Sequence, residues 1–299
     1  MTQQIPIADE ALATDPVLDA ARRDGTHPVA SGVAYRRLGI VNVVFVGSPD
    51  AGDRGWVLVD AGLPGTKGMI ESAAAALFGE GARPAAILMT HAHFDHVGAL
   101  ELLAAQWDAP VYAHALERPY LGGSASYPPG DPSVGGGLMA ALARFYPRGP
   151  VDVSERLREL PADGSVPPLA GWRWIHTPGH SVGHVSFFRE ADRTLIAGDA
   201  FVTTRQESAY AAITQAPEMH GPPMYYTVEW DKAKRSVEDL AALEPEIVVT
   251  GHGQAMHGPA MRAALSELAA RFDEVAVPAQ GRYLAHPARA ETGEAYVHP

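Results

Sequence analysis

The chain has 299 residues, of which 46% are hydrophobic, and its 23 Lys and Arg side chains face 35 Asp and Glu, so the formal net charge is −12. This length and composition are typical of a globular protein and exclude collagen, coiled coils and disordered chains. The negative charge argues against nucleic-acid binding, which depends on clustered Lys and Arg, and against binding to an anionic membrane surface. We therefore expect a small-molecule substrate as the partner.

The sequence also restricts compartment and metal chemistry. It has no apolar run near the ~20 residues of a membrane span and no basic and apolar segments of a signal peptide at its start, so we expect a cytoplasmic protein without a membrane partner. It contains no cysteine, which leaves no disulfide, no thiolate ligand and no cysteine nucleophile. Any metal must therefore be bound by His and carboxylate side chains.

The predicted elements follow one another in an α/β pattern. Residues 1–32 predict a partly ordered N-terminal arm with a short helix near 12–23, and residues 33–299 predict a single domain. Apolar runs predict strands, and helical periodicity predicts helices between them. The strands are expected at 41–47, 56–62, 85–90, 109–114, 172–177, 184–190, 194–199 and 246–251, and the helices at 67–78, 97–107, 232–243 and 259–272.

A long irregular segment interrupts this pattern. Residues 120–150 are rich in Gly, Pro and Tyr, with one helical stretch at 138–146. Irregular segments of this length are uncommon inside a compact domain and are usually functional loops or lids. We therefore predict a lid-like insert around 120–150.

Four candidate metal ligands occupy six consecutive positions directly after the strand expected at 85–90. They are His91, His93, Asp95 and His96. Clustered imidazoles without a cation lose solvation and repel one another when protonated, whereas a divalent ion stabilises the same cluster. The segment therefore predicts a metal site.

Three further polar residues each follow a later predicted strand. His180, Asp199 and His252 stand in the segments TPGHS, AGDAF and TGHG. In α/β sheets, ligand sites form beyond the carboxyl ends of the strands, so loops distant in sequence converge there. The alternative, ordinary turn residues, explains the neighbouring glycines but not the repeated His and Asp.

Together these segments resemble the metallo-β-lactamase superfamily. HAHFDH is similar to its HxHxDH motif, and TPGHS, AGDAF and TGHG are similar to its later ligand loops, in the same order from about residue 40 to 253. The resemblance implies an α/β (α+β) fold, a four-layer αββα sandwich, with two metals at one edge. It also implies two ligand sets with a bridge between them, namely His91, His93 and His180, then Asp95, His96 and His252, with Asp199 as the bridge.

Two further residues are expected to support the ligands. Asp60 resembles the superfamily's early Asp, which orients a ligand histidine through a hydrogen bond, although an ordinary strand-end Asp is the alternative. His184 is expected either to donate a hydrogen bond behind the ligands or to be a plain strand residue.

The ligand types favour a hydrolytic dinuclear centre. Nitrogen and oxygen donors suit two Zn²⁺ ions, and also Mn or Fe. We predict that a metal-bridging hydroxide attacks a small ester, lactone or thioester, with Asp95 as the catalytic proton carrier. The substrate pocket is expected to lie between the insert and the segment after Asp199, where aromatic and donor side chains gather, although these residues could simply pack under a loop. The candidates are Tyr210, His220, Met224, Tyr225, Tyr226 and Trp230.

Departures from known branches of the superfamily leave alternatives open. Asp199 stands where β-lactamases of the cysteine type carry Cys, which leaves promiscuous β-lactam hydrolysis as an alternative only. Val202 stands where the similar acyl-homoserine-lactone lactonases place Tyr, so another tyrosine would have to assist the oxyanion. The chain after Gly253 is shorter and less basic than the glutathione-binding region of glyoxalase II. A mononuclear iron enzyme similar to persulfide dioxygenases, a non-catalytic metal-binding module and a homodimeric assembly also stay open.

Overall fold

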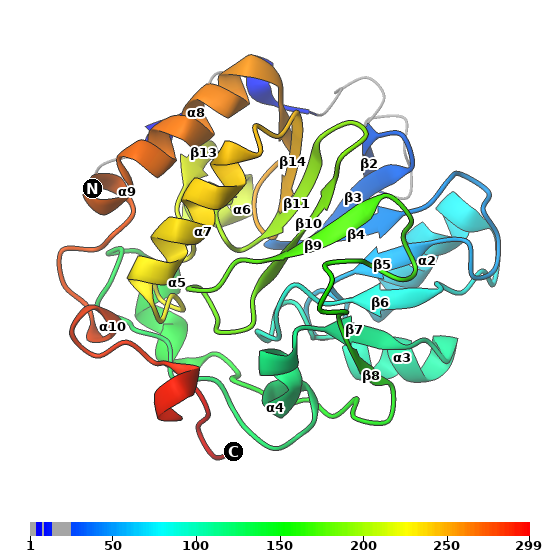
Figure 1. The fold of residues 1–299 in the computed structure, drawn as a ribbon, viewed down its shortest axis with the longest axis horizontal. Coiled ribbons are helices and arrows are strands. Elements are labelled where there is room, and N and C mark those ends of the chain that lie inside the picture. The colour runs from blue at the N-terminus through cyan, green and yellow to red at the C-terminus, as the bar shows by residue number, and fades with distance from the viewer. Residues whose placement is uncertain (1–3, 8, 14–24) are drawn as a thin grey trace.

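Two β-sheets pack face to face between two layers of helices (Figure 1). The computed structural model describes residues 4–7, 9–13 and 25–299. Helices α2 (Lys67–Phe78) and α3 (Leu100–Trp107) cover one sheet, and α7 (Trp230–Ala242) and α8 (Gly258–Ala270) cover the other. This is the αββα sandwich that the resemblance implied.

The larger sheet has seven strands in sequence order. It is antiparallel through its first four strands and parallel from the fourth to the seventh. The strands are β2 (Thr26–Ala30), β3 (Val33–Leu38), β4 (Val41–Val46), β5 (Val57–Val59), β6 (Ala86–Leu88), β7 (Val111–Ala113) and β8 (Leu157–Glu159).

The second sheet has five strands in the order β15-β14-β11-β10-β9, and a small third sheet has the order β1-β13-β12. In the second sheet, β11 and β14 run parallel, which brings their carboxyl ends to the same edge. The strands are β9 (Trp172–His176), β10 (Val185–Arg189), β11 (Thr194–Gly198), β14 (Ile247–Thr250) and β15 (Met256–His257), with β1 (Ile5–Pro6), β12 (Val202–Thr204) and β13 (Pro217–His220) in the small sheet.

Short helices complete the connections between these layers. Helix α5 lies in the insert at residues 120–150, and α9 and α10 lie in the C-terminal segment. They are α4 (Arg118–Leu121), α5 (Leu138–Leu142), α6 (Ala209–Thr214), α9 (Phe272–Val275) and α10 (Arg282–Ala285), with the 3₁₀ turns η1 (Asp9–Ala11), η2 (Ala115–Glu117), η3 (Ala143–Phe145) and η4 (Ala290–Thr292).

Side-chain alternation explains why the central strands are apolar on both faces. Phe45 and Leu58 point to the helices and join a core with Trp56 and Phe78, whereas Val44 and Val57 point to the other sheet. Successive side chains of a strand face opposite sides, so a strand between two packed layers needs apolar residues at every position. The apolar sequences of these central strands are therefore the ones from which strands could be predicted.

The structure differs from the prediction near the N-terminus. Residues 26–30, expected in the arm, form β2 at the edge of the large sheet, and Ile5–Pro6 pairs with β13. From residue 14 to 23 the predicted helix lies outside the described residues. In the part of the chain that the structure describes, no helix has the length and apolarity needed to cross a membrane.

Candidate metal centre

Loops that follow strands of both sheets meet at one edge of the sandwich. The HAHFDH loop follows β6, and the other loops follow β9, β11 and β14. All the candidate ligands are buried, with at most 4% of any one of them exposed. They are His91, His93, Asp95, His96, His180, Asp199 and His252.

The seven side chains form overlapping groups in which the candidate ligand atoms lie within 4.8 Å of one another. The groups are His91–His93–His180, His91–His96–Asp199 and Asp95–His96–His252. The Asp199 Oδ2 atom lies 3.4 Å from the His180 Nε2 atom and 3.1 Å from the His252 Nε2 atom. The carboxylate therefore lies between the two ligand sets that the sequence predicted.

Several atoms at the centre are suited to bind a cation. The Nε2 atoms of His91 and His96 and the Oδ1 atom of Asp199 are buried and have no hydrogen-bond partner among the described residues. Buried polar atoms are nearly always paired, so orphaned lone pairs that converge on one point fit the ligands of an ion. The imidazole and carboxylate donors at this centre are therefore chemically suited to bind divalent metals.

The protonation states of three of these side chains are those of metal ligands. Burial, reinforced by the neighbouring imidazoles, lowers the pKa of His91 and His93 well below the ordinary value, which leaves both rings neutral. Burial alone would raise the pKa of Asp199, but the charges of His252 and His96 hold it well below its usual range. Neutral imidazoles and an ionised carboxylate are the forms that bind a metal. Burial alone would lower the pKa of His96 and of His252, but the charge of Asp199 raises both above the ordinary value, so these two rings carry protons that a metal would displace.

Asp60 supports a candidate ligand from behind. Its Oδ2 atom lies 2.8 Å from the His96 Nδ1 atom, and its Oδ1 atom accepts the Thr90 backbone N–H at 2.8 Å. Its backbone has a φ of 60°, in the left-handed region that non-glycine residues rarely adopt. Such strain persists only where the surrounding structure holds it, and here it directs a carboxylate to a ring nitrogen.

His184 accepts a hydrogen bond from the backbone of the loop that carries Asp199. Its Nε2 atom accepts the Asp199 backbone N–H at 2.9 Å, and its Nδ1 atom lies 2.8 Å from the Thr177 hydroxyl. Across from it, a Cβ atom at Gly251 would lie 2.0 Å from the Asp199 Oδ1 atom. Glycine at 251 therefore leaves the space that the Asp199 carboxylate occupies.

An aromatic wall lies beside the centre. The ring of Tyr226 stacks on His93 with the centroids 4.4 Å apart, and the Tyr226 hydroxyl is buried without a hydrogen-bond partner among the described residues. Tyr225 and Met224 pack in the same cluster, as do Phe94 and Tyr146. The insert supplies Tyr146 and also Tyr127, whose ring lies 4.4 Å from His93; sequence reasoning did not single out either tyrosine.

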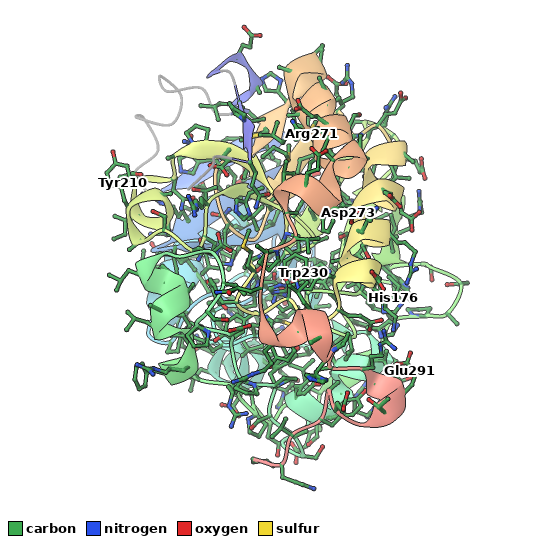
Figure 2. All side chains as sticks on the ribbon, turned by 90° about the vertical axis from the view of Figure 1, so that its left-hand side faces the viewer. His176, Tyr210, Trp230, Arg271, Asp273 and Glu291 are labelled. Carbon is green, nitrogen blue, oxygen red and sulfur yellow. The ribbon has the colours of Figure 1, made fainter. Side chains whose placement is uncertain are left out.

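Three of the predicted pocket residues, Tyr210, Trp230 and His220, lie away from the candidate metal centre. Tyr210 is 75% exposed and points outward, because helix α6 buries Ala211 and Ala212 on its opposite side (Figure 2). Trp230 packs against Phe272 in the core beneath the helices, so it is not part of the wall.

His220 is buried near the small third sheet. Its Nε2 atom lies 2.9 Å from the Gln4 Nε2 atom and 3.2 Å from the Glu207 Oε2 atom. With Met224 it lines a cavity of about 440 Å³ to which none of the seven candidate ligands contributes. The structure therefore brings Tyr226 against a candidate ligand, with Tyr225 and Met224 in the same cluster, but it does not bring Tyr210, His220 or Trp230 to the centre.

Two known proteins are similar to this chain in sequence. The chain is 44% identical over 258 residues to the probable metallo-hydrolase YflN of Bacillus subtilis, across 86% of this chain and 97% of that protein. It is 36% identical over 133 residues to a hydroxyacylglutathione hydrolase of Alkalilimnicola ehrlichii, across 44% of this chain and 39% of that protein.

A solved structure and a family model agree with the fold. The crystal structure of a beta-lactamase domain protein from Burkholderia ambifaria superposes with a TM-score of 0.60 at 21% identity, over 87% of this chain and 78% of that one. The model of the metallo-beta-lactamase superfamily matches residues 36–252. The chain therefore belongs to the metallo-β-lactamase superfamily.

Proposed function

We propose that the chain is a dinuclear metal-dependent hydrolase that acts on a small ester, lactone or thioester. The observation that carries the proposal is the position of Asp199, whose carboxylate lies between two groups of buried candidate ligand atoms. Relatives named as a probable metallo-hydrolase and a hydroxyacylglutathione hydrolase support a hydrolytic reaction, and the second name supports a thioester.

The ligand atoms define the chemistry that a bound metal would add. His91, His93 and His180 would hold one ion, and the second set would hold the other. Two divalent ions, with Zn²⁺ the first expectation and Mn or Fe as alternatives, would lower the pKa of a bound water to about 7 and polarise an acyl oxygen.

Asp95 and Tyr226 would perform the remaining steps. Asp95 lies at the aromatic wall, with its Oδ2 atom 3.5 Å from the His252 Nε2 atom, and would take up the proton of the attacking water. The unpartnered hydroxyl of Tyr226 would donate a hydrogen bond to the acyl oxygen as negative charge develops on it. Stacking on His93 distinguishes Tyr226 from Tyr225 as this donor.

The pocket wall favours a small and largely apolar acyl group. Phe94, Met224 and Tyr225 present carbon surface in the cluster that contains Tyr226, whose ring stacks on His93. A complete second ligand set is the feature that favours a dinuclear hydrolase over a mononuclear iron enzyme.

Metal analysis followed by a substrate panel tests the proposal. The purified protein should bind two divalent ions per chain and hydrolyse members of an ester, lactone and thioester panel, and a chelator should abolish turnover that Zn²⁺ then restores. His91→Ala should lose metal and turnover together, while His286→Ala, at an exposed histidine, should lose neither. One bound iron with oxygen consumption, or full metal loading without turnover of any panel member, would contradict it.

A further inference from the structure

Glu117 is a buried carboxylate to which the reaction above assigns no part. It lies at the end of η2, directly after β7, with 0% of its surface exposed. Burial of an unpaired carboxylate is costly, so such a group persists only where hydrogen-bond donors surround it. Its donors come from the loops that carry the candidate metal ligands.

Each oxygen of Glu117 binds a different loop. The Oε1 atom accepts hydrogen bonds from the Ser181 hydroxyl at 2.8 Å and from the Gly183 backbone N–H at 2.9 Å. The Oε2 atom accepts from the Ala92 backbone N–H at 3.2 Å and from the Tyr127 hydroxyl. Ser181 follows His180 directly, and Ala92 lies between His91 and His93, so one carboxylate connects the two loops.

The packing around Glu117 leaves little freedom for either loop. A Cβ atom at Gly183 would lie 2.8 Å from the Glu117 Cγ and Oε1 atoms, so the loop after His180 rests directly on the carboxylate. Tyr127, on the other oxygen, has its ring 4.4 Å from His93 and stacks on Tyr120 at 3.7 Å. The carboxylate, the loop and the tyrosine therefore fix one another.

The other ligand set has separate supports. The Asp60 carboxylate holds His96, and the His252 Nδ1 atom lies 2.7 Å from the Ile40 backbone oxygen. Glu117 has no hydrogen bond to Asp95, His96 or His252 among the described residues. The two sets therefore rest on different carboxylates, although Asp60 also reaches the first set through the Thr90 hydroxyl, which lies 3.0 Å from the His91 Nδ1 atom.

We propose that Glu117 is a positioning residue that fixes the His91–His93 loop relative to the His180 loop and thereby preorganises one of the two metal sites and not the other. The inference rests on the proposed dinuclear centre. Hydrogen bonds to a carboxylate are about twice as strong as neutral ones, and loss of a group that orients metal ligands typically weakens metal binding about 10- to 100-fold. Glu117→Gln keeps the size of the side chain but replaces one accepting oxygen with an amide that only donates, so one loop loses its acceptor.

Competition between the metal-free protein and a chromophoric chelator for Zn²⁺ tests the inference. The unaltered chain should show two affinities, and Glu117→Gln should weaken one of them about 10- to 100-fold and leave the other unchanged. His252→Ala retains the His91–His93–His180 set, so the double variant with Glu117→Gln should bind Zn²⁺ more weakly at that site than His252→Ala alone. His93→Ala disrupts that set, so the double variant with Glu117→Gln should have the same Zn²⁺ affinity as His93→Ala alone.

A matched control separates positioning from general loss of a buried carboxylate. Asp131 is also buried and accepts from the Ser133 backbone N–H and hydroxyl and from the Arg282 backbone N–H, so Asp131→Asn should leave both affinities unchanged. If Glu117→Gln does not fold, Ser181→Ala and Tyr127→Phe each remove one donor and should weaken the same site about 2- to 10-fold.

The outcomes distinguish the inference from the proposed function. If Glu117→Gln lowers the Zn²⁺ affinity of both sites equally, or of neither, the role of Glu117 is overturned. Two bound ions in the unaltered chain would still uphold the dinuclear centre. Absence of Zn²⁺ binding in the unaltered chain would instead refute the proposed function, and the positioning role with it.

Discussion

Asp199 is the residue on which the dinuclear assignment depends. Asp199→Asn keeps the shape of the side chain but removes the negative charge that lies 3.1 Å from His252 and 3.4 Å from His180. We expect the variant to retain fewer than two metal ions per chain and to lose hydrolysis, as measured by metal analysis and by turnover of the panel. Asp192→Asn, at the opposite end of β11 where the carboxylate accepts from Thr194, should retain both ions; equal metal content in the two variants would contradict the bridging role.

Tyr226 gives a second prediction about single residues. Because its hydroxyl has no partner, Tyr226→Phe should not disturb the fold, but it should lower kcat about 10²-fold with little change in KM if the hydroxyl stabilises the developing charge. Steady-state kinetics of Tyr226→Phe and Tyr225→Phe make the comparison. A larger loss for Tyr225→Phe would assign the role to the neighbouring tyrosine.

His114 should make the stability of the fold depend on pH. Burial, with a smaller contribution from His176, lowers the pKa of His114 from 6.5 to about 4. The unfolded chain therefore binds this proton near pH 6.5 and the folded chain only near pH 4, so acidification between these values lowers the free energy of unfolding. The neutral ring also accepts the Leu116 backbone N–H, which a protonated nitrogen cannot do.

Replacement of this histidine tests the sign. His114→Asn retains an acceptor at this N-terminal cap but does not titrate. In denaturant unfolding with a chelator present, its free energy of unfolding should fall less between pH 6.5 and 4 than that of the unaltered chain. An identical or steeper fall would show that His114 does not contribute.

At the residue scale, local motifs were predictable and distant contacts were not. HAHFDH places four candidate ligands in six positions, and the three later candidates each follow a recognisable apolar strand. Glu117 has no such signal, because its donors lie 10, 25, 64 and 66 positions away and meet it only after folding. Tyr210 was placed at the pocket wrongly, because the side of a short helix that faces the protein depends on the packing around it.

At the scale of elements, the packing of helix α2 on the large sheet gives a stability prediction. Phe78 stacks on Trp56 with ring centroids 4.6 Å apart and is 3% exposed. Phe78→Ala should lower the free energy of unfolding by about 3–5 kcal/mol through lost burial and the cavity it leaves. Leu102→Ala, at a leucine of α3 that is 61% exposed, should change it by less than about 0.5 kcal/mol in the same denaturant experiment; similar losses in both would contradict this packing.

Elements were predictable where burial makes their sequence apolar. Strands β4, β5, β6, β11 and β14 lie between packed layers and were all expected from their apolar runs. Strands β2 and β8 were missed because they lie at the edges of the large sheet, where half-exposed positions admit Pro, Arg and Glu. Strand β8 also has only three residues, which is too short for an alternating pattern to be detected. Strand β3 lies between β2 and β4 and was missed as well, because Arg36 and Arg37 interrupt its apolar sequence.

At the scale of the whole molecule, the sandwich explains how distant loops form one centre. Strands β6, β9, β11 and β14 of the two sheets end at the same edge of the sandwich, so the loops that follow them bring their His and Asp residues together. The order of strands and helices predicted this convergence. The insert's contribution was harder to foresee, because Tyr127 and Tyr146 reach the centre from a segment without regular spacing.

Anomalous diffraction from crystals of the zinc-loaded protein tests the central claim most directly. Data collected above and below the zinc absorption edge should show two peaks per chain, one within coordination distance of His91, His93 and His180, the other within coordination distance of Asp95, His96 and His252, with Asp199 contacting both. A single peak served by one ligand set, or zinc bound elsewhere with these side chains apart, would contradict the dinuclear centre.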